Sequence, residues 1–100
     1  MSNPVVLNLN EWVWTKVATN VTTGSISRLN TVVSYYQTYR LTGESGPPTP
    51  TVGEIPEEAI RIFDKSNQIS ISSADYIDVY IMCSNSDKDS NETGKLRIDI

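Results

Sequence analysis

The sequence predicts an all-β protein with one domain, residues 1–100, folded as an antiparallel β-sandwich with a jelly-roll-like arrangement of about eight short strands. Composition is the first reason: 9 Val, 10 Ile and 10 Thr stand against only 3 Ala and 5 Leu. Branched side chains fit a pleated sheet, whereas Ala and Leu favour helices. The second reason is that apolar and polar residues alternate along most of the chain, which is the period of a half-buried strand.

The N-terminal part is expected to supply four strands. Val5–Leu9 is an apolar segment bounded by Pro4 and Asn10, and we expect it to pair within its own sheet rather than with the edge of a neighbouring subunit. The three strands expected after it cover Glu11–Ala18, Gly24–Leu29 and Thr31–Thr42. In the last of these, Val33, Tyr35, Tyr39 and Leu41 are predicted to share the core face, opposite Ser34, Thr38 and Arg40.

A loop and four further strands are expected in the C-terminal part. Thr42–Gly53 is rich in Gly and Pro and cannot belong to a ladder. Pro56–Ala59 permits one helical turn, with Pro at its first position and acidic residues at its N-terminal end. The strands expected after the loop are Ala59–Phe63, Gln68–Ser73, Asp75–Cys83 and Lys95–Ile100.

The faces of these last strands also follow from alternation. Ile77, Val79, Ile81 and Cys83 are predicted to face the core, with Asp78 and Tyr80 on the solvent side. Leu96, Ile98 and Ile100 alternate up to the last residue, so the C-terminus is expected to be a paired strand. Ser84–Gly94 is a polar connection, within which Asp87–Asn91 resembles the opening of a calcium loop. The match stops there, because Glu92 stands where such a loop needs Gly and Ile98 where it needs Glu.

Charge and rare residues restrict the function. The chain has 8 basic and 12 acidic residues, a net charge of −4, which argues against binding to nucleic acid. It has no His, and Cys83 is its single cysteine, so no intramolecular disulfide, His-based metal site or His-assisted triad can form. We therefore expect no enzymatic activity, no metal and no cofactor. No export signal and no long apolar stretch are evident, so a membrane location is not expected either.

Aromatic residues mark the candidate binding surface. Trp12 and Trp14 lie on the same side of the expected strand Glu11–Ala18, whose other side is also apolar. Tyr35 and Tyr36 are adjacent on a strand, so one of them must leave the core face. Because Trp and Tyr dominate interface anchors, these four residues are predicted to contribute to a protein interface.

Three segments resemble small virion proteins of tailed phages. They are the stretch Trp14–Gly24, the run Tyr36–Arg40 with Thr42 and Gly43 and the Pro-rich turn after it, and the run Ile77–Ile81. Their order and spacing are similar to those of the small β-sandwich auxiliary proteins of phage particles, typically capsid decoration (cement) proteins. The acidic loop Ser84–Gly94 is longer in this chain than in that family.

The resemblance implies a non-enzymatic protein that docks on the outer surface of a phage capsid, after synthesis in the host cytoplasm, and reinforces it. Its implied partners are the major capsid protein or another virion protein, and copies of itself in a homo-oligomer. Two alternatives stay open: a head-fibre, tail or adaptor component of the virion, and a carbohydrate- or calcium-binding β-module. In the latter, Ser84–Gly94 and exposed aromatic residues would form the site.

Overall fold

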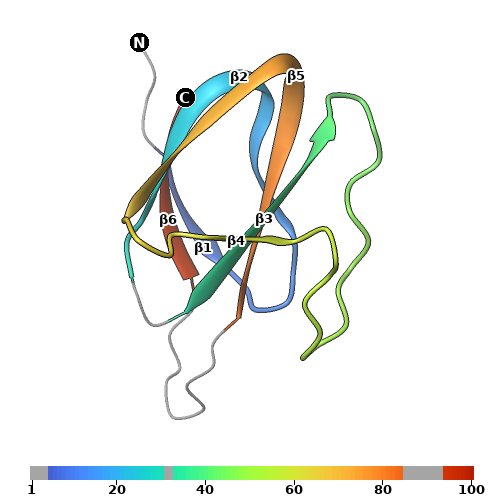
Figure 1. The fold of residues 1–100 in the computed structure, drawn as a ribbon, viewed down its shortest axis with the longest axis vertical. Coiled ribbons are helices and arrows are strands. Elements are labelled where there is room, and N and C mark those ends of the chain that lie inside the picture. Colours follow the sequence, from blue (N-terminus) through green and yellow to red (C-terminus); the bar gives the residue numbers. More distant parts are fainter. Residues whose placement is uncertain (1–4, 31–32, 85–93) are drawn as a thin grey trace.

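The computed structural model describes residues 5–30, 33–84 and 94–100, and this part of the chain contains strands and no helix (Figure 1). All strand pairs are antiparallel, and they form a single six-stranded sheet in the order β1-β6-β2-β5-β3-β4. The sheet is not closed, because β1 and β4 lie at its two ends and do not pair. The strands are β1 (Val5–Leu9), β2 (Thr15–Arg28), β3 (Ser34–Leu41), β4 (Ile60–Ile62), β5 (Gln68–Ser84) and β6 (Gly94–Asp99).

The all-β antiparallel part of the prediction is confirmed, but six strands replace the expected eight. Two pairs of expected strands are each one long strand: β2 spans 14 residues and β5 spans 17. In β2, the pairing with β5 shifts register three times between Lys16 and Thr23, and Asn20 has a φ of +55°. Irregularities of this kind bend a strand without ending it. Breaks in alternation therefore mark bends here, not strand ends.

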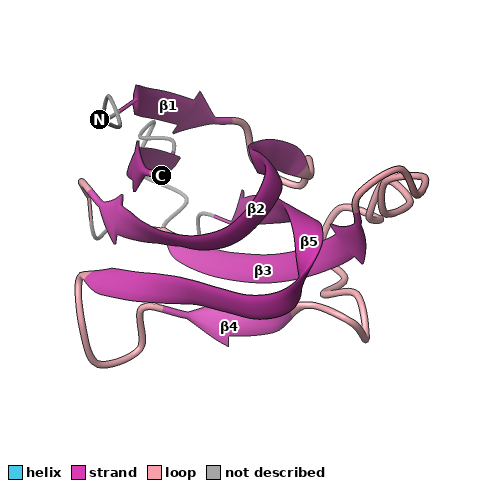
Figure 2. Cartoon of the chain, turned by 90° about the horizontal axis from the view of Figure 1, so that it is seen from above, coloured by secondary structure: helices cyan, strands magenta, loops and turns pink. Residues whose placement is uncertain are grey.

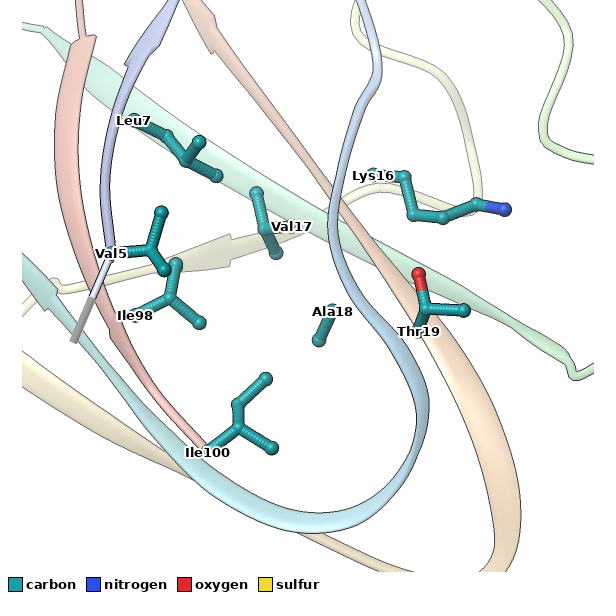
Figure 3. A pocket seen from close by; sticks show the side chains of 8 residues that line it. All are labelled: Val5, Leu7, Lys16, Val17, Ala18, Thr19, Ile98 and Ile100. Atoms are coloured by element: carbon teal, nitrogen blue, oxygen red, sulfur yellow. The ribbon is translucent and has the colours of Figure 1, made fainter. Parts of the chain in front are cut away.

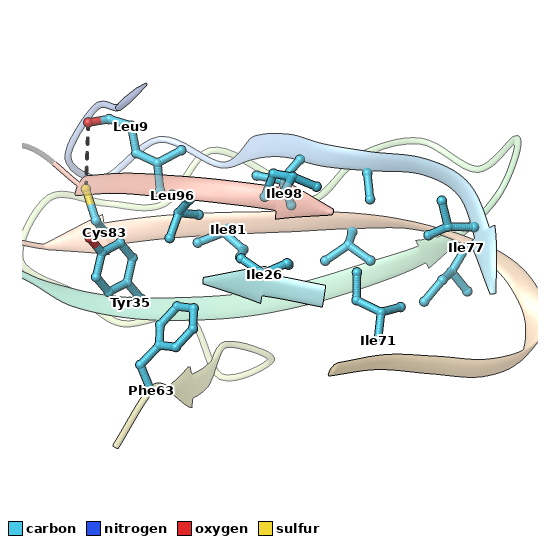
Figure 4. Packing of buried hydrophobic residues seen from close by; sticks show 14 of the residues in the cluster. Leu9, Ile26, Tyr35, Phe63, Ile71, Ile77, Ile81, Cys83, Leu96 and Ile98 are labelled. Carbon is cyan, nitrogen blue, oxygen red and sulfur yellow. Dashed lines mark hydrogen bonds between the residues drawn. The ribbon is translucent and has the colours of Figure 1, made fainter. Parts of the chain in front are cut away.

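The bends curl the sheet around its core. Figure 2 shows β2 and β5 curving, so that β1 and β6 lie across from β3 and β4. The side chains on the concave side form one buried apolar cluster with contributions from β1, β2, β3, β5 and β6 (Figure 4). Leu9, Ile26, Tyr35, Ile81 and Leu96 are among its largest members, each at most 1% exposed. One curled sheet thus buries its own concave face.

The N-terminal and C-terminal strands pair as expected. β1 pairs with β6 along its whole length, from Val5 opposite Ile98 to Leu9 opposite Gly94, so the N-terminal strand completes its own sheet. β6 also pairs with the last residues of β2, which confirms a paired C-terminal strand. Ala59 N–H bonds the Pro56 carbonyl at 3.0 Å and closes a single turn, so the short helix permitted there does not form.

Alternation assigned the faces of β3 and β5 only in part. Tyr35 is buried as predicted, but Tyr39 and Leu41 are 53% and 46% exposed, whereas Thr38 is 4% exposed. Asp78 and Tyr80, predicted on the solvent side, are also buried. The reason is that the convex side of these strands is covered too, so alternation no longer distinguishes inside from outside.

The covering segment is the Gly/Pro-rich loop that follows β3. A Cβ atom at Gly46 would lie 3.1 Å from the Tyr80 hydroxyl, so the loop backbone packs directly on that ring. Arg40 on β3 and Glu58 near the end of the loop form an ion pair at 2.9 Å. The loop predicted at Thr42–Gly53 is therefore confirmed, and it contributes to burial.

No helix in the described ranges is long and apolar enough to cross a membrane.

Candidate protein-docking surfaces

The structure gathers Trp12, Trp14 and Tyr36 around one end of β5. Trp12 lies in a turn with a φ of +58°, and its N–H bonds the Cys83 carbonyl at 3.0 Å. Trp14 directly precedes Thr15, the first residue of β2, which is in register with Ile81. Tyr36, on the other side of β5, is in register with Met82. All three side chains are partly exposed, and we call this group the aromatic end.

The expectation that Trp12 and Trp14 lie on a regular strand is wrong, because β2 begins only at Thr15. The left-handed backbone at Trp12 is uncommon for a bulky residue and belongs to the turn that connects β1 to β2. The turn still brings both indoles to the aromatic end. The Trp14 indole nitrogen is buried and has no hydrogen-bond partner among the described residues.

Tyr35 lies in the core and not at the aromatic end. It is 1% exposed, and its ring packs edge-on against Phe63 with centroids 5.3 Å apart. Its hydroxyl donates to Asn30 Oδ1 at 2.9 Å and accepts from Lys95 N–H at 3.1 Å. Burial raises the pKa of this phenol. Of the adjacent pair Tyr35 and Tyr36, Tyr36 is the residue that leaves the core face.

Cys83 is a core residue with an unreactive environment. The side chain is fully buried, and its Sγ lies 3.9 Å from the Leu9 carbonyl oxygen. Burial raises the pKa of the thiol, which disfavours the thiolate needed for nucleophilic chemistry. Gly94 makes this packing possible, since a Cβ there would lie 3.0 Å from Tyr35 and 3.1 Å from Cys83. The interpretation of Cys83 as a small core residue is confirmed.

Asp78 is a buried carboxylate whose oxygens are engaged by three donors. Oδ1 accepts from Asn20 N–H at 2.9 Å and from the Thr42 hydroxyl at 3.4 Å, and Oδ2 lies 3.7 Å from Lys16 Nζ. Lys16 also lies over the Tyr80 ring, 5.8 Å from its centroid. Buried charges persist when they are paired in this way. The group connects β2, β5 and the start of the loop, which is a structural role.

An apolar groove opens between β1 and the first half of β2 (Figure 3). It has a volume of about 260 Å³. Side chains from β1 and β6 line one wall, and residues at the start of β2 line the other. The lining residues are Val5, Leu7, Lys16, Val17, Ala18, Thr19, Ile98 and Ile100. Sequence reasoning missed this groove, since a local pattern of apolar residues does not show that two strands stay apart.

Three further features bear on what the described part of the chain could bind: a second pocket, groups that could hold a metal ion, and the calcium-like run. A smaller notch of about 180 Å³ is lined by Gln37, Tyr39, Ile77 and the segment 70–73 of β5. No group of three or more His, Cys, Asp or Glu residues that would hold a metal ion occurs among the described residues. The calcium-like run Asp87–Asn91 lies outside those residues.

Protein-family models, curated proteins and solved structures give no match to this chain. The described residues offer two candidate binding surfaces, the aromatic end and the apolar groove.

Proposed function

We propose that this protein is a non-enzymatic virion structural protein that docks on the outer surface of a phage capsid and reinforces it. Its fold would be a sandwich-like, jelly-roll-like form of the curled sheet, with the two halves of the sheet facing each other across the core. The proposed partners are the major capsid protein, or another virion protein, and further copies of the chain. Neither nucleic acid nor a membrane is a proposed partner.

The convergence of Trp12, Trp14 and Tyr36 at the aromatic end is the observation that supports this proposal most directly. The two segments that carry them are more than twenty residues apart in sequence, and both reach the same end of β5. Partly exposed Trp and Tyr residues are the side chains that most often anchor protein interfaces, where one anchor contributes about 2 kcal/mol or more. The resemblance to phage decoration proteins supplies the identity of the proposed partner.

Several copies of a modest surface suffice for such a role. A specific interface buries about 800 Å² on each partner, which is a small part of this domain's surface. An oligomer that presents several aromatic ends to a repeating shell gains avidity of about 10²–10⁴ without any new kind of contact. The net charge of −4 favours the outside of a shell over the side that faces packaged DNA.

The test is binding to capsids assembled without the protein. The isolated protein is expected to bind them saturably and to raise their resistance to heat or chelation. Trp12→Ala and Tyr36→Ala are expected to weaken binding at least tenfold with little change in melting temperature. Tyr76→Ala is the matched control, because Tyr76 is 61% exposed and belongs to the bend of β5, away from the aromatic end.

Two results would reject the capsid role. Particles that are equally robust without the protein would favour a head-fibre, tail or adaptor component. Loss of binding in Tyr76→Ala to the same extent as in Trp12→Ala would show that the aromatic end is not the docking site. A carbohydrate- or calcium-binding module would instead reveal itself by a melting shift on addition of sugar or of sub-millimolar calcium.

A further inference from the structure

The groove between β1 and β2 is bordered by two strand edges that have no ladder partner among the described residues. β1 pairs with β6 on one edge only. The first half of β2 pairs with β5 on one edge, and β6 reaches β2 only from Ser25 to Arg28, so the other edge of residues 15–19 has no ladder partner, and residues 16–19 line the groove. Two open edges that border one space offer backbone donors and acceptors on both sides of it.

The two edges are too far apart to pair with each other. Almost no Cα atom of β1 lies within 8 Å of β2, whereas directly paired strands are about 4.8 Å apart. A strand inserted between two others needs a separation of about 9–10 Å. Figure 3 shows β1 and β2 diverging around the groove, with apolar side chains pointing into it from both sides.

The interior of the groove selects for apolar, uncharged side chains. Val5, Leu7 and Ile98 face Val17 and Ala18 across it. Lys16 is the only lining residue with a charged side chain, and its ammonium group is directed away, toward Asp78. A charge brought into this space would therefore be unpaired and unfavourable.

The volume of the groove fits side chains better than a cofactor. A cavity of about 150 Å³ holds one benzene molecule, and typical small-molecule pockets start at about 300 Å³. At about 260 Å³, the groove has room for one or two branched apolar side chains of an inserted strand. Val5 and Ile100 at its open end are 50% and 45% exposed, so a strand has direct access.

The occupant must have both of its own edges free. Every described strand of a second copy already has at least one edge paired: β1 and β4 have one neighbour each, and the inner strands have two. No described strand of a second copy can therefore bond to both walls at once. This requirement favours an extended segment that is not part of any sheet before it binds.

We propose that the β1–β2 groove is a strand-acceptor site, which binds an extended, uncharged segment of another polypeptide with apolar residues at alternate positions. The bound segment pairs with β1 on one edge and with the start of β2 on the other, and its apolar side chains enter the groove. This is the strand-addition mode of peptide recognition, in which main-chain bonds give affinity and side-chain pockets give specificity. The proposal concerns a different surface from the aromatic end and does not depend on the capsid role.

The test uses a labelled, end-capped peptide of sequence KTVTVTVTK and measures its binding by fluorescence anisotropy. Saturable binding is expected, with at least tenfold weaker binding of KTVTPTVTK, because its central proline lacks the N–H and disrupts the strand. Hydrogen exchange is expected to slow at residues 5–9 and at residues 16–19 together when the first peptide binds. Slowing at residues 5–9 alone would show simple addition to the β1 edge and would overturn the inserted strand.

Two neighbouring substitutions provide a matched pair. Val5→Glu places a charge in the groove and is expected to weaken peptide binding at least tenfold. Val6→Glu changes a residue of nearly equal exposure, 52%, on the opposite face of the same strand, and is expected to alter binding less than threefold. Ala18→Leu, which fills the groove from the other wall, is expected to act like Val5→Glu.

Three outcomes would overturn the proposal. The first is the absence of saturable binding by KTVTVTVTK. The second is an equal loss of binding in Val5→Glu and Val6→Glu. The third is a concentration-dependent dimer of the unmodified protein that Val5→Glu abolishes, since a second copy would then be the occupant.

Discussion

The two edges of the sheet are built in opposite ways. β4 has three residues, carries Arg61 at its centre, and this arginine pairs with Asp64 at 2.9 Å. β1 has five residues and no charge, and both Val5 and Val6 are about half exposed. Short length and charge are the usual means by which proteins keep an edge strand from pairing with another chain. β4 has both protections and β1 has neither, so β1 is the edge at which association is expected.

The support behind the two edges also differs. β1 rests on β6, whose Leu96 and Ile98 are buried in the core. β4 rests on β3 through only three pairs of residues, and its first residue, Ile60, is 57% exposed. The β1 edge is thus the better anchored of the two. A binding edge requires this support, because it must keep its shape without a partner.

The largest expected effect on stability comes from removing β6, the strand that supports β1. Deletion of Leu96–Ile100 removes most of β6, which lies between β1 and β2, and leaves β1 with no strand to pair with. We expect insoluble protein or loss of a cooperative melting transition by circular dichroism. Removal of Ile100 alone, which is 45% exposed and follows β6, should leave the transition intact. A soluble five-residue truncation that melts cooperatively would contradict the assigned role of β6.

Two single substitutions compare how strongly the β1 edge and the β4 edge are supported. Ile98→Ala removes a buried side chain beneath the β1 edge and should lower the free energy of unfolding by about 2–5 kcal/mol. Ile60→Ala removes the same atoms from the β4 edge, where the side chain is mostly exposed, and should change it by less than about 1 kcal/mol. Urea denaturation measures both. Similar losses in the two variants would show that the two edges are supported alike.

The sequence predicted the strands better than their arrangement. β1 matches its expected bounds, and the paired C-terminus follows from the alternation of Leu96, Ile98 and Ile100. Local alternation cannot tell a bend from an end, so two bent strands, β2 and β5, were expected as four. Nor does it show what covers a face, which is why Asp78 and Tyr80 were expected in solvent although the loop and Lys16 bury them.

The binding surfaces were predictable only where chemistry marks them. Trp12, Trp14 and Tyr36 stand out by residue type, and the adjacency of Tyr35 and Tyr36 indicated that one must leave the core. Their convergence at one end of β5 depends on the turn at Trp12 and on pairing across three strands, neither of which a local pattern encodes. The β1–β2 groove depends on the absence of a pairing, for which the sequence has no signal.

Alkaline pH should loosen the β1 end of the molecule before the β4 end. Burial raises the pKa of Cys83 above its ordinary value of 9.0, and the thiol lies against the Leu9 carbonyl at the end of β1. A raised pKa in the folded state means that the stability contribution is complete below pH 9 and is lost as pH rises through the folded-state pKa. Melting temperature should therefore fall as pH rises above 9.

The matching control removes the titrating thiol. Cys83→Ala is expected to melt lower than the unmodified protein at pH 7, because it leaves a cavity, and to lose less of its stability above pH 9. Tyr35, whose pKa is also raised, still titrates in this variant and leaves part of the dependence in place. Hydrogen exchange at Leu9 that accelerates no more than exchange at Ile62 between pH 8 and pH 10, after correction for intrinsic rates, would argue against Cys83 as the cause.

The smallest expected effect on stability comes from a substitution in β4. This substitution should instead change how strongly the protein associates with itself. The pair Arg61–Asp64 is exposed on both sides, so Arg61→Val should alter the free energy of unfolding by no more than about 0.5 kcal/mol. It also turns β4 into three consecutive branched apolar residues on an open edge, which should promote concentration-dependent association in sedimentation velocity. Arg97→Val is the matched control, because Arg97 is similarly exposed but belongs to β6, both of whose edges are paired. If Arg97→Val associates as strongly as Arg61→Val, loss of surface charge is the cause. If only Arg61→Val associates, the arginine protects the β4 edge from pairing. The lack of any such residue on β1 then leaves that strand free to bind.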